Sequence, residues 1–96
     1  MLFKEAKKII TRHKDELLKL GAHALSIFGS TAREESTAKS DVDVLVDFDS
    51  DKGIFGFLDL REYLETILKC KVDLVTRNAL HWALKDRILS ESRNVF

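Results

Sequence analysis

The chain has 96 residues, of which 45% are hydrophobic and 33% are charged, and its formal net charge is zero. This composition is typical of one small globular domain, which we expect to span residues 1–96. No apolar run reaches the roughly 20 residues of a membrane-spanning helix. The first ten residues carry four charges and no signal-peptide apolar region, which predicts a cytoplasmic location. The single cysteine, Cys70, excludes an internal disulfide and is interpreted as a small buried residue.

The charge is unevenly distributed, because eight of the sixteen acidic residues lie between residues 34 and 59. An acidic centre repels nucleotides unless cations lie between them, so we expect a metal-dependent site and little direct binding of nucleic acid. The basic residues near the N-terminus are Lys4, Lys7, Lys8, Arg12 and Lys14. We interpret them as a solvated helix face, with contact to an anionic partner as the alternative.

Residues 2–20 have the apolar spacing of an amphipathic helix, and Gly21 is placed to end it. The apolar stripe consists of Phe3, Ala6, Ile10, His13, Leu17 and Leu20. His13 is interpreted as a packed histidine at the edge of the core, and His23 follows in a turn without an evident partner. We expect neither histidine to carry chemistry.

An apolar strand over residues 24–28 leads into Gly29 and Ser30. Gly29 allows a sharp turn that brings backbone N–H groups close to a ligand, and Ser30 adds a hydroxyl donor. Residues 31–39 are predicted to form a short helix and a loop. If the helix covers residues 31–35, its N-terminus also favours a phosphate group.

Two further polar residues near this turn have open interpretations. Arg33 either reaches a phosphate or pairs with Glu34 or Glu35. Ser40 either binds a phosphate or only leads into the next strand.

The next strand begins with two carboxylates, Asp41 and Asp43. Alternate residues of a strand share a face, so the two side chains lie about 7 Å apart and can converge on a hard cation such as Mg²⁺. The residues of the opposite face, which we expect in the core, are Val42, Val44 and Val46. These carboxylates and the Gly29 turn can address one ligand only if the strand of residues 24–28 is an antiparallel neighbour of this strand.

The stretch of residues 47–55 alternates acidic with other residues, as a calcium-binding loop does. It lacks the glutamate that such a loop requires at its twelfth position, where this chain has Leu58. We therefore predict a flexible acidic loop at the mouth of the site.

A helix over residues 56–69 is followed by a strand over residues 72–75, which carries Asp73 at its start, directly after Val72. The apolar residues of this helix are Phe57, Leu60, Leu64 and Ile67, with a neighbouring stripe through Leu68 as the alternative. A helical crossover usually joins parallel strands, which would set Asp73 beside Asp41 and Asp43. Three carboxylates can then share two metal ions.

A last helix is predicted over residues 79–92, with Asn78 as its N-cap. His81 and Trp82 fall off its apolar stripe. We expect part of this helix to present an apolar surface to a partner protein or to a second copy of the chain.

The order Gly29-Ser30, ten residues, Asp41-Val42-Asp43 and a distal Asp73 resembles the nucleotidyltransferase superfamily that includes the DNA polymerase β palm, and within it the minimal nucleotidyltransferases. Glu34 stands where many members have glycine. The resemblance covers nearly the whole chain. It implies an α/β (α+β) fold in which a small mixed sheet is flanked by helices.

The resemblance also implies an enzyme that transfers AMP from ATP to an acceptor hydroxyl. Two Mg²⁺ ions, with Mn²⁺ as the alternative, would bridge Asp41, Asp43 and Asp73. Gly29 and Ser30 would hold the terminal phosphates so that the attack is in line. Asp73 would also help to deprotonate the acceptor.

A chain of this length leaves few residues to hold an acceptor, so a partner protein is expected to supply it. Minimal nucleotidyltransferases of this kind commonly act as antitoxins beside HEPN-domain toxins, which are ribonucleases, and modify a toxin tyrosine with AMP. The resemblance implies that role here. The alternatives are an antitoxin that neutralises its toxin by binding alone, and a transferase that modifies nucleic-acid ends.

Overall fold

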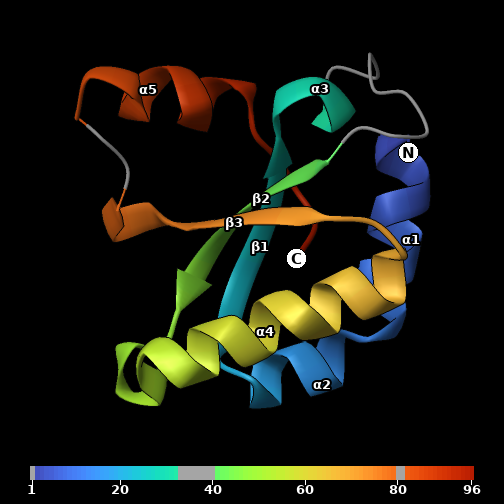
Figure 1. Ribbon diagram of the computed structural model, residues 1–96. Helices are drawn as coiled ribbons and strands as arrows, with labels where there is room; N and C mark the ends of the chain where they lie inside the picture. Colours follow the sequence, from blue (N-terminus) through green and yellow to red (C-terminus); the bar gives the residue numbers. More distant parts are fainter. Residues whose placement is uncertain (1, 33–40, 80–81) are drawn as a thin grey trace.

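The computed structural model describes residues 2–32, 41–79 and 82–96. Within these residues, one sheet has the strand order β3-β2-β1-β4, with helices packed on it (Figure 1). The elements are α1 (Phe3–Arg12), α2 (Lys14–Lys19), β1 (Ala22–Phe28), α3 (Gly29–Ala32), β2 (Val42–Phe48), the 3-10 helix η1 (Ser50–Lys52), α4 (Gly53–Leu68), β3 (Val72–Thr76), the 3-10 helix η2 (Arg77–Ala79), α5 (Trp82–Glu91) and β4 (Arg93–Asn94). Among the helices so described, none combines the length and apolar character needed to cross a membrane.

The sheet is mixed, as the sequence predicts. β1 pairs antiparallel with β2, and β2 pairs parallel with β3. The long helix α4 forms the crossover between the two parallel strands, which is the usual way to connect them. The short strand β4, which pairs antiparallel with β1, was not predicted. Two residues are too few to show a strand periodicity in the sequence.

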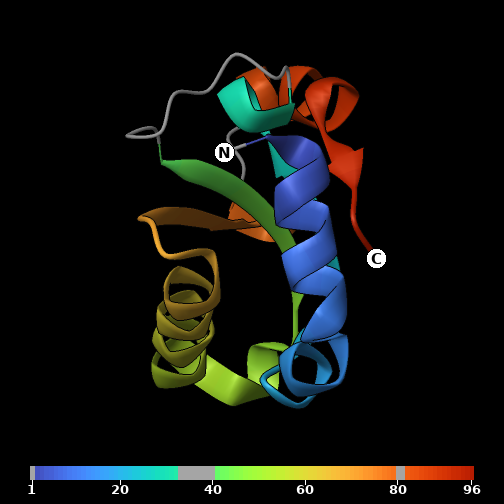
Figure 2. The same cartoon turned by 90° about the vertical axis from the view of Figure 1, so that its right-hand side faces the viewer.

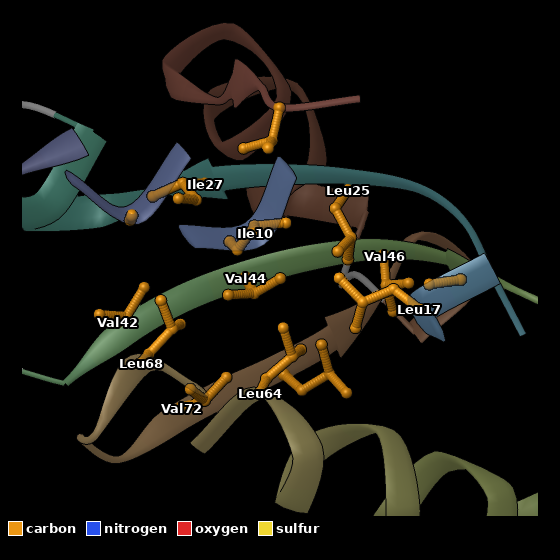
Figure 3. Close-up of a cluster of buried hydrophobic side chains, with 14 of the residues drawn as sticks. Ile10, Leu17, Leu25, Ile27, Val42, Val44, Val46, Leu64, Leu68 and Val72 are labelled. Atoms are coloured by element: carbon orange, nitrogen blue, oxygen red, sulfur yellow. The ribbon is translucent and has the colours of Figure 1, made fainter. Parts of the chain in front are cut away.

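The hydrophobic core lies between one face of the sheet and the helices α1, α2 and α4 (Figure 3). Its buried strand residues are Ala22, Leu25, Ile27, Val42, Val44, Val46, Val72 and Leu74. The helices contribute Phe3, Ala6, Ile10, Leu17, Ala32, Leu60, Leu64 and Leu68, and Val95 follows β4. The three valines of β2 are fully buried, which confirms the face assigned to them from the alternation of the strand. The acidic residues of β2 therefore lie on the opposite face.

The N-terminal segment forms two helices instead of the single one predicted over residues 2–20. Four residues of the predicted apolar stripe, Phe3, Ala6, Ile10 and Leu17, are buried as expected, whereas His13 and Leu20 are half-buried. Gly21 follows directly on the C-cap of α2. The break falls at His13, which is non-helical and whose N–H donates to the carbonyl of Ile10. The His13 ring makes a hydrogen bond of 2.9 Å to the hydroxyl of Tyr63 on α4. This contact confirms His13 as a packed residue, and it joins positions fifty residues apart.

The acidic stretch of residues 47–55 is not a loop at the mouth of the site, so this prediction was wrong. Its residues complete β2, form η1 and begin α4. Phe48 pairs with Ala22, whereas Asp43 pairs with Phe28 at the other end of the same ladder. Asp43 and Phe48 are five residue steps apart along β2, which corresponds to about 17 Å. One acid of this stretch has a local structural role, because the Asp49 side chain caps η1 by accepting from the N–H of Asp51 at 3.0 Å.

The other predicted elements differ from the structure mainly at their ends. Helix α4 begins three residues before the predicted residue 56, and its buried stripe is the alternative one through Leu68. The C-terminal helix α5 is shorter than the predicted 79–92 because η2 precedes it. His81 lies outside the described residues, and the side chains of Asn78 and Trp82 are not described, so the cap and the partner surface stay predictions.

The two ends of the sheet carry different elements. Figures 1 and 2 place α3 and α5 at one end, with α2 and the first turns of α4 at the other. β1 runs toward α3, and β2 starts from that end. The residues singled out in the sequence therefore collect at the end where α3 lies.

Candidate functional site

Gly29 and Asp43 meet where β1 ends and β2 begins. Phe28, the last residue of β1, pairs with Asp43. Gly29 has a φ of 69°, in the left-handed region, and a Cβ at this position would overlap the Asp43 carboxylate. Only glycine satisfies both the backbone angle and the close approach. The antiparallel meeting of the two motifs, predicted from the sequence, is confirmed.

Asp73 lies beside Asp43 on the neighbouring strand. The parallel register pairs Asp43 with Asp73 and Val42 with Val72. Adjacent strands lie about 4.8 Å apart, and paired residues point to the same face of the sheet. Asp43 is half-buried and Asp73 is exposed. The prediction that the crossover sets Asp73 beside the acidic strand is also confirmed.

Asp41 occupies the position immediately before β2 and is exposed. The N–H of Val42 donates to the carbonyl of Lys71 at 3.0 Å, which ties the start of β2 to the start of β3. Asp43 and Asp73 thus lie at one corner of the sheet, on the face opposite the core, and Asp41 precedes β2 at the same corner.

Carboxylate oxygens are the donors that Mg²⁺ and Mn²⁺ prefer, and neighbouring carboxylates repel one another until a cation joins them. The residue types at this corner therefore fit a divalent cation. In the part of the chain that the structure describes, no three His, Cys, Asp or Glu side chains form a group able to hold a metal ion. The ladder fixes Asp43 beside Asp73, whereas Asp41 precedes the first paired residue of β2.

The remaining predicted phosphate ligands are only partly described. Ser30 belongs to α3, a helix of one turn that begins at Gly29 instead of residue 31, but its side chain is not described. Arg33 and Ser40 lie outside the described residues. Their contacts with a phosphate remain predictions.

Glu65 and Cys70 lie near the start of β3, and the sequence did not single out either of them as a site residue. The carboxylate of Glu65, on α4, accepts a hydrogen bond of 3.1 Å from the N–H of Val72, the residue before Asp73. Cys70 is half-buried between α4 and β3. Burial raises the pKa of the Cys70 thiol, and the charges of Asp41 and Glu65 raise it further. The thiol is therefore neutral near pH 7, as expected for a packing residue. The sequence carries no signal for the Glu65 contact, because it crosses a turn.

A model of the nucleotidyltransferase domain matches residues 7–95. The chain therefore belongs to the nucleotidyltransferase domain family, whose members are enzymes. Among its relatives is the protein adenylyltransferase MntA of Thermococcus cleftensis. The two are 38% identical over 92 residues, which cover 95% of this chain and 93% of that protein.

Solved structures agree with this assignment. A protein provisionally named a minimal nucleotidyltransferase superposes with a TM-score of 0.84 at 28% identity, covering 97% of this chain and 95% of its own. A chain from the complex of a tri-AMPylated Shewanella oneidensis HEPN toxin with an MNT antitoxin gives a TM-score of 0.57 at 18% identity, covering 90% of this chain and 71% of its own. The second likeness is one of fold. The family and fold predicted from the sequence are confirmed.

Proposed function

We propose that this protein is a metal-dependent adenylyltransferase that moves AMP from ATP to a hydroxyl group of a partner protein, acting in the cytoplasm as one domain of residues 1–96. The observation that carries the proposal is the pairing of Asp43 with Asp73 at the corner where Gly29 packs against Asp43. The choice of AMP and of a protein acceptor is supported by the relative named as a protein adenylyltransferase.

Asp43, Asp73 and Asp41 would hold the metal ions, which we propose to be two Mg²⁺, with Mn²⁺ as the alternative. When bound, these cations neutralise charge at the α-phosphate and on the pyrophosphate. The acceptor oxygen forms a bond to the α-phosphorus while the bond to the β-phosphate oxygen breaks. Pyrophosphate leaves with that electron pair.

We propose that Asp73 is the base that accepts the proton of the acceptor hydroxyl. Its carboxylate is exposed, so an acceptor on a second protein can reach it. Asp43 is half-buried and faces Gly29, which suits it to holding and orienting and not to exchanging protons with an incoming group. Asp73 then releases the proton to solvent.

Gly29 and Ser30 are proposed to hold the terminal phosphates, with Arg33 and Ser40 as further phosphate contacts. The missing Cβ at Gly29 makes room for the carboxylate of Asp43, which lies directly against the main chain. A phosphate held at this turn would therefore lie beside that carboxylate, with a cation offsetting their repulsion. Most of the rate would come from positioning and charge neutralisation, as in other phosphoryl transfers.

We propose that the acceptor lies on a HEPN-type toxin and that this protein is its antitoxin. The support is the shared fold with a chain of the HEPN–MNT complex, together with the motif spacing in the sequence. The acidic corner disfavours nucleic-acid ends as acceptors, because their phosphates add negative charge.

The test uses α-labelled ATP, Mg²⁺, this protein and the product of its neighbouring gene. The variant is Asp41→Asn/Asp43→Asn, and the matched control is Asp47→Asn, which removes an exposed acid from the same face of β2 at its other end. We expect wild type and Asp47→Asn to label the partner covalently. The double variant should lose at least about 100-fold in rate, the size expected when transition-state charge loses its stabilising group. Chelation of the metal should abolish transfer.

Two results would contradict the proposal. If the double variant labels the partner at the wild-type rate, Asp41 and Asp43 do not take part in the transfer reaction. A stable complex of the two proteins without any labelling by wild type would instead favour neutralisation by binding alone.

A further inference from the structure

The turn between α4 and β3 determines where Asp73 stands. Only residues 69–71 connect the end of α4 to the start of β3. Lys69, the C-cap of α4, has a φ of 56° and a ψ of 37°, a left-handed conformation that is uncommon outside glycine. Its N–H donates to the carbonyl of Glu65 at 2.9 Å. The helix therefore ends in a tight, defined reversal and not in a flexible connection.

Glu65 contacts both sides of this reversal. Its backbone carbonyl accepts from Lys69 on the helix side. Its side-chain Oε2 accepts from the N–H of Val72 on the strand side, at 3.1 Å. One residue of α4 thus joins the last turn of the helix to the first residue of β3. Asp73 follows Val72 directly.

The hydrogen bond to Val72 compensates for the position of β3 in the sheet. β3 is an edge strand, paired on one side with β2. The N–H groups that point away from β2 have no strand to bond within the described sheet, and such groups need another acceptor or water. Glu65 supplies an acceptor for one of them at the first residue of the strand. The start of β3 is therefore held from α4 as well as from β2.

The Glu65 carboxylate is directed to the backbone N–H of Val72, so it would act on the acidic corner through the position of β3. Outer-shell groups of this kind typically change metal affinity 10- to 100-fold when they are removed.

We infer that Glu65 is a positioning residue that holds Asp73 beside Asp43 and thereby sets how tightly the acid pair binds a divalent cation. The effect on AMP transfer rests on the proposed transferase activity and the effect on cation binding rests on the proposed metal site, whereas the effect on β3 rests on neither. The role needs an acceptor oxygen at Glu65, and it does not need the negative charge.

The experiment compares Glu65→Ala, Glu65→Gln and the control Glu62→Ala, which truncates an exposed residue of α4. Three quantities are measured: amide exchange of Val72 by NMR, the dissociation constant for Mn²⁺, and kcat and KM for Mg²⁺ in AMP transfer. We expect Glu65→Ala to speed Val72 exchange at least about tenfold and to weaken Mn²⁺ binding about 10- to 100-fold. Glu65→Gln should restore most of both, and Glu62→Ala should match wild type.

Unchanged Val72 exchange and Mn²⁺ affinity in Glu65→Ala would overturn the inference. Failure of Glu65→Gln to restore Mn²⁺ binding would also overturn it, because charge and not the hydrogen bond would then be responsible. If no variant and no wild-type protein transfers AMP while Val72 exchange and Mn²⁺ affinity respond as expected, the inference stands and the proposed function fails.

Discussion

Two glycines flank β1, and they serve different ends of the molecule. Gly21 precedes the strand with a φ of 101°, and Gly29 follows it with a φ of 69°. A Cβ at Gly21 would meet the side-chain stem of Lys52 at 2.9 Å and the ring of Phe48 at 3.1 Å. A Cβ at Gly29 would overlap the Asp43 carboxylate. The lack of a side chain thus lets hydrocarbon groups pack against the backbone at Gly21 and lets a carboxylate pack against it at Gly29.

The surroundings of the two glycines match this difference. The carbonyl of Gly21 accepts from the N–H of Asp49 at 2.8 Å, and the rings of Phe48 and Phe57 pack edge to face at 5.7 Å close by. At that end the backbone meets apolar side-chain groups. The Gly29 end leaves Asp73 exposed to solvent. Substitutions at the two glycines should therefore separate loss of stability from loss of activity.

The largest effect is expected from Gly29→Ala. The new Cβ would displace the Asp43 carboxylate, and the left-handed backbone would add roughly 1–2 kcal/mol of strain. We expect AMP transfer to fall at least about 100-fold, since small misplacements of a site cost that much. The kcat/KM for transfer and the midpoint of thermal unfolding test this together. Full activity in a folded Gly29→Ala protein would show that the close approach to Asp43 is not needed.

A smaller and different effect is expected from Gly21→Ala. Overpacking against Lys52, together with strain, should lower the free energy of unfolding by about 1–3 kcal/mol. Transfer per folded molecule should stay within about twofold of wild type, because the site lies at the other end of the sheet. Urea unfolding and kcat/KM at low temperature measure the two quantities.

The matched control is Gly21→Ala combined with Lys52→Ala, which removes the atom that the new Cβ meets first. The double variant should recover part of the lost stability. If the double variant recovers no stability, the whole loss in Gly21→Ala is due to backbone strain.

The smallest effect is expected from Cys70→Ala. This variant tests how a residue near the acidic corner contributes to the free energy of unfolding. The pKa of the Cys70 thiol is raised in the folded protein, so the unfolded chain loses the thiol proton first as pH rises. The free energy of unfolding is therefore unaffected below the ordinary thiol pKa of 9.0 and falls above it. Urea unfolding at pH 7.5 and pH 10 should show a smaller decline in Cys70→Ala than in wild type. Equal declines would mean that the thiol does not contribute.

The acidic corner could be predicted because local rules determine it. Alternation along a strand places Asp41 and Asp43 on one face, and the parallel crossover brings Asp73 to them. Both rules use only neighbouring residues and the length of the intervening helix. The requirement that Gly29 meet Asp43 then determines the antiparallel pairing of β1 with β2.

The wrong or missing predictions depend on contacts that the sequence does not show. The helix break at His13 accompanies a hydrogen bond to Tyr63, and the position of β3 depends on Glu65 reaching Val72. Neither contact leaves a periodic signal. The stretch of residues 47–55 was misplaced because β2 carries acids at both of its ends, and composition alone does not distinguish a site from a helix cap.

The pairing of Asp43 with Asp73 also determines when the acidic corner can form during folding. The hairpin of β1 and β2 joins residues close in sequence, so Gly29 and Asp43 can meet early in folding. Asp73 lies thirty residues beyond Asp43 and joins it only after α4 has crossed back over the sheet. A chain still emerging from the ribosome therefore holds half of its acid pair. Catalytic competence should therefore appear only when β3 joins the sheet and its residues Val72 and Leu74 complete the core.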